Sequence, residues 1–315
     1  MVGGGIDVTE HLEPIRAFLS ERFELVSDVE ELQRGGWSSA YSFRSGQHDL
    51  ILRVGHHAED FNKERYASTW RVAGVPVPDV LDLGEALDGF YIVSQRHEGQ
   101  KLADLDPARV PRAIESLFEV LVAMREIRLP GRGFGIWRTP DCNAPATTWG
   151  EHLRSVGSRD ETRLVGWRHR LAANPRASSA FKQGCAAVEE LTIDLPETRG
   201  LVHADLLLNH LVDGNDGVTA VFDWGNALAG DPLYDIAWIL YCIPWFQAID
   251  RRHVLALARR RFPNDDIDRL LPLYELHIGV ASLQYQAFAE DLASLETSAA
   301  SISRLLLDID GRRSP

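Results

Sequence analysis

The sequence contains few cysteines and no long apolar run. Its three cysteines, Cys142, Cys185 and Cys242, are far apart and odd in number, and their spacing fits no zinc motif. A disulfide framework and a cysteine-based metal cluster are therefore both unsupported, which indicates a reducing compartment. No stretch of about eighteen apolar residues occurs, so we expect no transmembrane helix and no membrane partner.

Basic residues are also in short supply. The chain has 33 Lys and Arg against 46 Asp and Glu, which gives a formal net charge of −13 at pH 7. Because nucleic-acid phosphates require a basic surface, this balance argues against a nucleic-acid partner. It favours a cationic partner, although an acidic surface also serves solubility alone. The start, Met1 to Asp7, lacks the features of a secretory signal, and we expect a cytoplasmic protein.

The length allows one large domain or two lobes. The chain has 315 residues, of which 45% are hydrophobic, enough for a substantial core. It shows no internal repeat and no low-complexity tract. We expect a globular protein that acts as a monomer.

Two acidic residues eighteen positions apart carry the clearest chemical signal. Asp205 lies in the segment from His203 to His210, and Asp223 begins the tripeptide Asp223-Trp224-Gly225. Between them an apolar pair, a polar turn over residues 213–217 and an apolar strand over 219–222 predict a short hairpin. The hairpin would place both carboxylates at the same end of two paired strands, close enough to share a metal and a substrate.

This arrangement fits phosphoryl transfer from ATP. That reaction needs one carboxylate in line with the attacking hydroxyl and another that holds the magnesium ion on the phosphates. Asp205 suits the first role and Asp223 the second. Taken singly, each aspartate also fits an ordinary turn or strand end, since Asp is common there. Together they favour a kinase.

The first third of the chain predicts a small antiparallel sheet with two helices. We expect helices over residues 12–23 and 59–73, and strands over 40–43, 50–54, 80–85 and 90–95. The Gly35-Gly36 turn with Ser38 and Ser39 is a candidate lid over phosphates, because glycine allows the backbone to approach them closely. An ordinary hairpin turn is the alternative.

Arg53 on the third strand is a candidate cation for the phosphates. Glu64 on the following helix is the carboxylate expected to pair with it and fix its position. The alternative is that residues 63–65 form a solvated helix surface.

After the polar stretch from Ser94 to Gly99 the pattern changes from strands to helices. This stretch is the expected hinge between a nucleotide-binding lobe, 1–96, and a helical lobe, 97–315. We expect helices over residues 111–127, from 149 onward behind a Thr148–Glu151 capping box, across 160–192 with a break at Asn174, and over 270–307.

The residues resemble the aminoglycoside phosphotransferase family. The likeness rests on segments spread over nearly the whole chain, among them 18–23, 52–54, 63–66, 77–85, 147–149, 201–205, 223–224, 230–231 and 244–245. It implies an α+β, protein-kinase-like fold with a small antiparallel-sheet lobe and a larger helical lobe. The implied activity is ATP-dependent phosphorylation of a hydroxyl on an aminoglycoside or aminocyclitol antibiotic of the hygromycin B type, which confers resistance.

The resemblance also implies roles for single residues. Asp205 is the base, Asp223 holds Mg²⁺, and Arg53 replaces the usual lysine as the partner of Glu64. The implied nucleotide contacts are Gly35, Gly36, Ser38 and Ser39 on the phosphates and Ser94, Gln95, Arg96 and His97 on adenine.

One position departs from the family pattern. The family places an asparagine, a second metal ligand, five residues after the catalytic aspartate; this chain has His210 there and Asn209 one position earlier. Because Mg²⁺ prefers oxygen ligands, either Asn209 reaches the ion, or it is bound weakly, or activity is reduced.

Candidates for the substrate pocket lie in the helical lobe. Amines and hydroxyls on the substrate call for acidic and aromatic side chains beside Asp205. By the resemblance these are Trp245, Gln284, Tyr285, Glu290 and Asp291, with core packing or a solvated surface as the alternative for each. Asp231 and Asp235 are expected to brace the lobe by capping a helix.

Two other functions remain open from the sequence. The same chemistry would serve a kinase for another small alcohol, such as choline, homoserine or a sugar-like metabolite. Arg53 and His210 are also compatible with a nucleotide-binding pseudokinase.

Overall fold

The N-terminal lobe is built on a five-stranded antiparallel sheet. In this computed structural model, which describes residues 12–32, 36–158 and 162–313, the strands are arranged in the order β1-β2-β3-β5-β4. Their bounds are β1 Val26–Glu31, β2 Ser38–Ser45, β3 His48–Gly55, β4 Val80–Ala86 and β5 Gly89–Gln95. The four predicted strands are thus confirmed, and β1 is an additional one.

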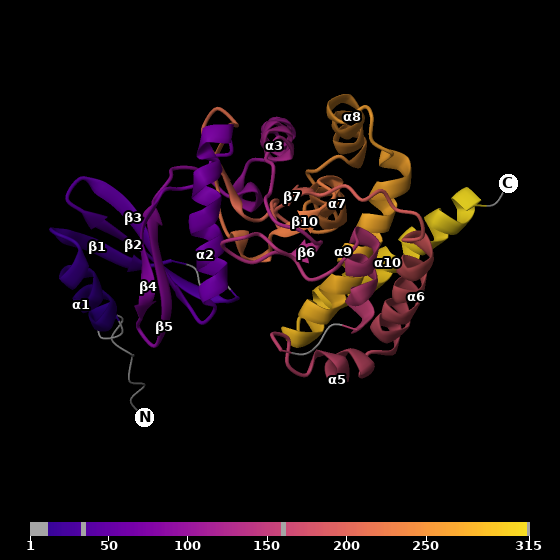
Figure 1. Cartoon of the computed structure of the whole chain (residues 1–315), viewed down its shortest axis with the longest axis horizontal. Helices are drawn as coiled ribbons and strands as arrows, with labels where there is room; N and C mark the ends of the chain where they lie inside the picture. Colours follow the sequence, from indigo (N-terminus) through magenta and orange to yellow (C-terminus); the bar gives the residue numbers. More distant parts are fainter. Residues whose placement is uncertain (1–11, 33–35, 159–161, 314–315) are drawn as a thin grey trace.

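A helix covers each face of this sheet. Helix α1, Glu13–Arg22, packs Ile15, Phe18 and Leu19 against buried residues of the strands, and the Phe18 and Tyr91 rings meet at 4.8 Å. Helix α2, Ala58–Ala67, lies on the other side, between the sheet and the helical lobe (Figure 1). It is therefore placed to contact both lobes.

The helix predicted over 59–73 changes character midway. After α2 the chain continues as a 3₁₀ helix, η2, Ser68–Ala73, and ends at Gly74 with a left-handed φ of 88°. The hydroxyls of Ser68 and Thr69 donate to the carbonyls of Arg65 and Tyr66, at 2.8 and 2.7 Å. These local bonds compete with the α-helical ladder, which explains the tighter turn.

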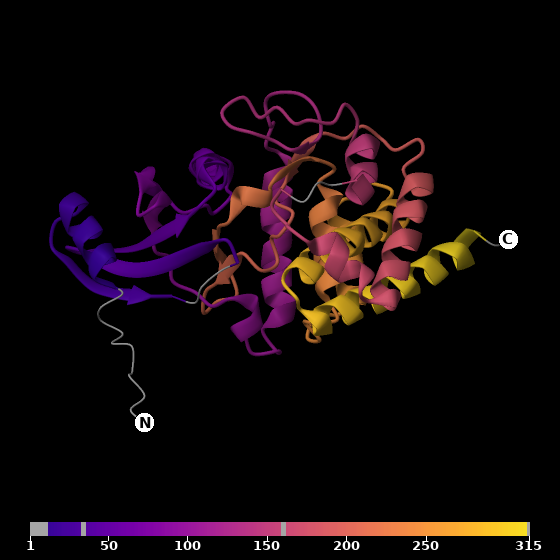
Figure 2. The same cartoon turned by 90° about the horizontal axis from the view of Figure 1, so that it is seen from below.

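The C-terminal lobe is mainly helical, and most of its helices contribute buried residues to one hydrophobic core. The helices are α3 Val110–Arg125, α4 Trp149–Arg154, α5 Trp167–Ala172, α6 Pro175–Leu191, α7 Leu233–Cys242, α8 Arg251–Arg261, α9 Ile267–Phe288 and α10 Leu292–Arg313, with short 3₁₀ turns η3 Leu102–Asp104, η4 Ser155–Ser158 and η5 Trp224–Asn226. Thr148 caps α4 as predicted, and Asn174, where the sequence predicts a break, caps α6. Both views place the sheet lobe at one end of the long axis and α10 toward the other (Figure 2).

Two small sheets lie where the lobes meet. The first has the order β6-β10-β7, with β6 Gly135–Ile136, β7 Gly200–Val202 and β10 Leu228–Gly230. The second is the predicted hairpin of β8, His210–Val212, and β9, Val218–Val221, with His210 opposite Val221. Gln100 exchanges two backbone hydrogen bonds of 2.9 Å with Val212, which ties the chain between the lobes to this hairpin.

The expected α+β, kinase-like two-lobe architecture is confirmed. Within the described part of the chain, no helix combines the length and apolarity needed to span a membrane.

Helix packing in the larger lobe predicts a selective effect of two glycine substitutions. A Cβ on Gly184 in α6 would lie 2.5 Å from a methyl group of Val280, whereas a Cβ on Gly311 in α10 would meet nothing within 4 Å. We expect Gly184→Ala to lower the free energy of unfolding by about 1 to 3 kcal/mol through overpacking. Gly311→Ala is the control, with no loss or a gain of up to about 1 kcal/mol. Urea unfolding of both variants decides; equal stabilities would contradict the packing.

Candidate active site

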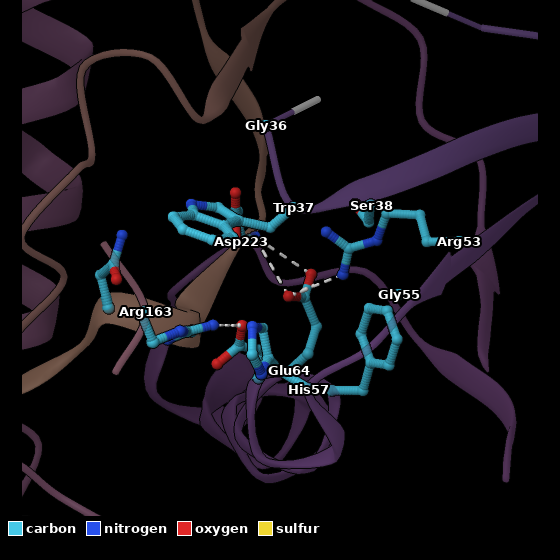
Figure 3. A pocket seen from close by; sticks show the side chains of 13 residues that line it. Gly36, Trp37, Ser38, Arg53, Gly55, His57, Glu64, Arg163 and Asp223 are labelled. Carbon is cyan, nitrogen blue, oxygen red and sulfur yellow. Dashed lines mark hydrogen bonds and ion pairs between the residues drawn. The ribbon is translucent and has the colours of Figure 1, made fainter. Parts of the chain in front are cut away.

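A cleft between the lobes gathers several of the predicted residues. The lining residues come from the glycine-rich turn, β3, α2, residue 163 and the segment after β9 (Figure 3); they are Gly36, Trp37, Ser38, Arg53, Gly55, His57, Asp60, Phe61, Glu64, Arg163, Asp223, Gly225 and Asn226. Gly35 lies outside the described residues. Ser39 is half-buried in β2, opposite Val54, and is not among the lining residues.

The carboxylates of Asp205 and Asp223 interact electrostatically. Asp205 lies in the loop between β7 and β8, and Asp223 follows β9, so the antiparallel hairpin brings both to its same end, as predicted. Burial, followed by the negative charge of Asp223, raises the pKa of Asp205 to about 8. Burial also raises the pKa of Asp223, an effect that Arg53 opposes. A cation bound between the carboxylates would relieve this repulsion.

Asp235 fixes the loop that carries Asp205. Its two carboxylate oxygens accept hydrogen bonds from the backbone amides of His203 and Ala204, both at 2.8 Å. Ala204 has a left-handed φ of 63°, which an alanine adopts only when its surroundings enforce it. Burial raises the pKa of Asp235 to about 7, and the two hydrogen bonds oppose the rise. The predicted brace is therefore present, but Asp235 holds the loop that carries Asp205 instead of capping a helix.

Asp231 follows the prediction more closely. It accepts the amide of Leu233 at 3.0 Å, at the start of α7, and the hydroxyl of Tyr274 at 2.8 Å. This carboxylate therefore fixes the start of the helix.

The predicted ion pair of Arg53 and Glu64 is confirmed. Arg53 Nη2 lies 2.8 Å from Glu64 Oε2, and both side chains are largely buried, so the alternative of a solvated surface at Glu64 is wrong. Glu64 also accepts the backbone amides of Asp223, at 3.1 Å, and Trp224, at 3.3 Å (Figure 3). One carboxylate thus links the sheet, α2 and the segment that begins with Asp223.

The glycine-rich turn closes against the helical lobe through Trp37, which the sequence analysis missed. Its ring stacks on Phe288 at 5.8 Å, with the two planes 5° apart. The Arg163 guanidinium lies 5.1 Å from the Trp37 centroid and pairs with Asp60 at 2.5 Å. A tryptophan in a turn rich in Gly and Ser was the available signal for this contact; Arg163 has none in its local sequence.

The predicted hinge begins within the sheet, at the end of β5. Ser94 and Gln95 belong to β5, and the amides of Gln95 and Arg96 already donate to Asp79 and Asp49, both at 2.9 Å. Burial lowers the pKa of His97. None of the four residues lines the cleft described above.

The structure separates Asn209 from His210. The Asn209 side chain donates to the Asp205 carbonyl at 3.1 Å and, through a hydrogen bond to the Asp205 carboxyl, opposes the rise of its pKa. His210 is fully buried in β8, and its Nδ1 lies 2.9 Å from the Leu206 carbonyl oxygen. The structure therefore corrects the prediction of His210 as a metal ligand. The start of β8 turns its ring into the core, and Asn209 occupies the position beside Asp205.

Of the candidate substrate-binding residues, two are partly exposed and a third is buried. Tyr285 is 43% exposed and Trp245 37% exposed. The Tyr285 ring lies 6.4 Å from that of Trp37, at the cleft. The prediction of Gln284 as a substrate-binding residue is corrected, because its position in α9 faces the core. The side chain is fully buried, and its amide donates to the Val156 carbonyl at 2.6 Å.

The two acidic candidates at the end of α9 have local partners. Glu290 pairs with Arg170 at 3.0 Å. Asp291 accepts the amide of Ser294 at 3.0 Å at the start of α10, and this bond lowers its pKa. Both carboxylates therefore have structural contacts of their own.

A two-lobe fold with paired carboxylates between the lobes defines a kinase-like phosphotransferase. The model of the family described as "Phosphotransferase enzyme family" matches residues 29–273, more than half of the sequence. The chain therefore belongs to this family.

Similar proteins narrow the comparison. The chain is 32% identical over 282 residues to the hygromycin-B 4-O-kinase of Escherichia coli. The aligned region covers 88% of this chain and 79% of the relative. A thermostable mutant of aminoglycoside phosphotransferase APH(4)-Ia, in a ternary complex with AMP-PNP and hygromycin B, matches with a TM-score of 0.80 at 31% identity, over 92% of this chain and 98% of the other. Spectinomycin phosphotransferase APH(9)-Ia shares the fold, with a TM-score of 0.62 at 12% identity over 92% and 93% of the two chains.

Because Asp235 holds the loop that carries Asp205, we expect its substitution to lower the rate of phosphotransfer by more than a loss of stability explains. Asp235→Asn cannot accept both loop amides, so Asp205 loses its fixed position; we expect the phosphotransfer kcat to fall by about a hundredfold. Asp231→Asn is the control, because it removes a similarly buried carboxylate that contacts α7 and Tyr274. Both variants should lose about 1 to 3 kcal/mol of stability. A kcat ratio near one between them would contradict the brace.

Proposed function

We propose that the protein phosphorylates a hydroxyl group of hygromycin B with ATP as the phosphate donor and thereby confers resistance. The observation that carries the proposal is the joint placement of Asp205 and Asp223 in a fold shared with a hygromycin-bound relative at 31% identity. The net charge of −13 supports a substrate that bears amines.

Asp205 is the proposed base. It takes the proton of the attacking hydroxyl while the new oxygen–phosphorus bond forms and the bond to the ADP oxygen breaks. A general base works best with a pKa near the working pH, and burial beside Asp223 moves the pKa of Asp205 in that direction. Asp235 keeps this carboxylate in place through the loop amides.

Asp223 and Asn209 are the proposed ligands of Mg²⁺. Both offer oxygen atoms, and the negative charge of Asp223, which raises the pKa of the buried Asp205, favours a cation between the two carboxylates. The described residues contain no cluster of three or more His, Cys, Asp and Glu able to hold a metal alone. That suits Mg²⁺, which usually takes one or two carboxylates together with water and substrate phosphates. When bound, the ion neutralises charge on the phosphate oxygens.

The phosphates are proposed to lie between two arginines. Arg53 enters the cleft from the sheet and Arg163 from the helical lobe, while Gly36 and Ser38 line the same space (Figure 3). A guanidinium carries five N–H donors, so the contact with Glu64 leaves Arg53 able to bind phosphate. Arg presents a fork where lysine presents a point charge.

We place adenine at the linker from Ser94 to His97, where lobes 1–96 and 97–315 join. The Arg96 amide still bonds to Asp49 of the sheet, whereas Gln100 already bonds to Val212 of the helical lobe. This change of partners supports a boundary at residues 96 and 97.

The proposed acceptor pocket contains Tyr285 and Trp245, whose partly exposed rings suit a sugar-like molecule. Glu290 and Asp291 follow Tyr285 closely in sequence and remain candidates for binding amines.

Arg53 and His210 were the two residues compatible with a pseudokinase, and neither now favours that alternative. Arg53 forms the expected pair with Glu64, and His210 lies in the core while Asn209 contacts Asp205. Another alcohol as acceptor is the second candidate function.

ADP release by the purified protein tests the proposal. We expect ATP with hygromycin B to give rapid ADP release, and choline or homoserine to give no increase over the rate without acceptor. Asp205→Asn should reduce the hygromycin-dependent rate by a factor of about 10² to 10⁴, because the base is lost while the nucleotide contacts remain. Release with another alcohol alone would replace hygromycin B as the substrate. Full activity in Asp205→Asn would remove this residue from the mechanism.

A magnesium titration separates Asn209 from His210. Asn209→Ala should raise the Mg²⁺ concentration at half-maximal rate by about tenfold or more, since it removes an oxygen ligand. His210→Asn should leave that concentration unchanged, because the ring is buried against the Leu206 carbonyl. A large shift in His210→Asn, with none in Asn209→Ala, would reverse the assignment.

A further inference from the structure

Lys63 is an unusual lysine. The sequence contains three lysines, and Lys101 and Lys182 are exposed, whereas Lys63 has no exposed surface. It belongs to α2, next to Glu64, and its ammonium lies 4.7 Å from the centre of the Trp137 ring. Burial lowers its pKa to about 8, an effect that Asp60 and Glu59 oppose. Placing an ammonium group here is costly, so its contacts need an explanation.

The ammonium of Lys63 is bound to the segment that follows Asp223. Nζ donates to the backbone carbonyls of Gly225, at 3.0 Å, and Ala227, at 2.9 Å. Glu64, the next residue of α2, accepts the amides of Asp223 and Trp224 at the beginning of the same segment. Two adjacent side chains therefore hold residues 223–227 at both ends, one through amides and the other through carbonyls.

The held segment is one that needs support. Asp223 has φ 64° and ψ 59°, the left-handed region, which residues with a side chain rarely adopt unless their surroundings enforce it. The chain then turns through η5. Gly225 leaves no room for a side chain there, because a Cβ would lie 2.9 Å from the Asp60 carboxyl carbon. The direction of the Asp223 carboxylate thus depends on how this turn is fixed to α2.

We propose that Lys63 is a positioning residue for Asp223: together with Glu64 it clamps residues 223–227 to α2 and so orients the magnesium-binding carboxylate. The proposal rests on the proposed role of Asp223. Lys63 is not among the residues that line the cleft, and it acts through the backbone. Removing its two hydrogen bonds leaves Asp223 charged and present but free to rotate with a loosened turn.

Lys63→Met tests the clamp. Methionine keeps an unbranched apolar chain against Trp137 but donates to neither carbonyl. We expect the Mg²⁺ concentration at half-maximal rate to rise by about tenfold to a hundredfold, as for other groups that orient metal ligands. Saturating Mg²⁺ should restore most of kcat, and the KM for hygromycin B should change less than about twofold. Lys182→Met, on the exposed surface of α6, is the matched control and should change none of these values.

A binding measurement keeps the test independent of the acceptor. Calorimetric titration with AMP-PNP at several Mg²⁺ concentrations should show the same shift in Lys63→Met. If the wild type binds AMP-PNP and Mg²⁺ but does not phosphorylate hygromycin B, the proposed function fails and the clamp is still tested. A lower melting temperature with an unchanged Mg²⁺ dependence would mean that Lys63 only stabilises the fold and would overturn the proposal. If Lys63→Met does not fold, Lys63→Leu, which also lacks a donor, is measured by the same criterion.

Discussion

The site depends on one carboxylate, that of Glu64. It neutralises Arg53 on the sheet and accepts the amides of Asp223 and Trp224 from the helical lobe. A buried carboxylate is tolerated only with such partners, so the position of each partner is coupled to those of the others. The positions of Arg53 and Asp223 are therefore not set independently: a shift of α2 would displace both at once.

Sequence reasoning succeeded where the signal was local. The hairpin that carries Asp205 and Asp223 follows from two apolar strands and a polar turn, because antiparallel pairing brings its two ends together. Strand alternation and helix caps gave most of the sheet and several helices. The pairing of Arg53 with Glu64 lies between distant segments; the prediction there drew on the chemistry of phosphoryl transfer and on family resemblance.

The failures share a physical cause, which is that local sequence does not say which way a polar side chain points. His210 and Asn209 are adjacent, yet the first enters the core and the second contacts Asp205, because β8 begins between them. Gln284 and Tyr285 are likewise adjacent in α9, where one is buried and the other is exposed at the cleft. Trp37 and Arg163 meet only in three dimensions: the sequence offers a signal for the tryptophan, in its turn rich in Gly and Ser, but none for the arginine.

Helix α2 shows why hydrophobic periodicity alone misjudges this site. Asp60, Lys63, Glu64 and Ala67 follow the i, i+3, i+4, i+7 spacing of a single helix face. That face is turned to the helical lobe, and each of its charged residues has partners. Asp60 pairs with Arg163, and Lys63 donates to two backbone carbonyls. Glu64 pairs with Arg53 and accepts two backbone amides. A face made of paired charges reads as solvent-exposed in the sequence but is an interface between lobes. An apolar contact adjoins this polar face: the Trp70 ring, in η2, lies 5.0 Å from the ring of Trp224, the residue that follows Asp223. The position of the segment after β9 is therefore fixed to α2 and η2 by paired charges and by aromatic packing together.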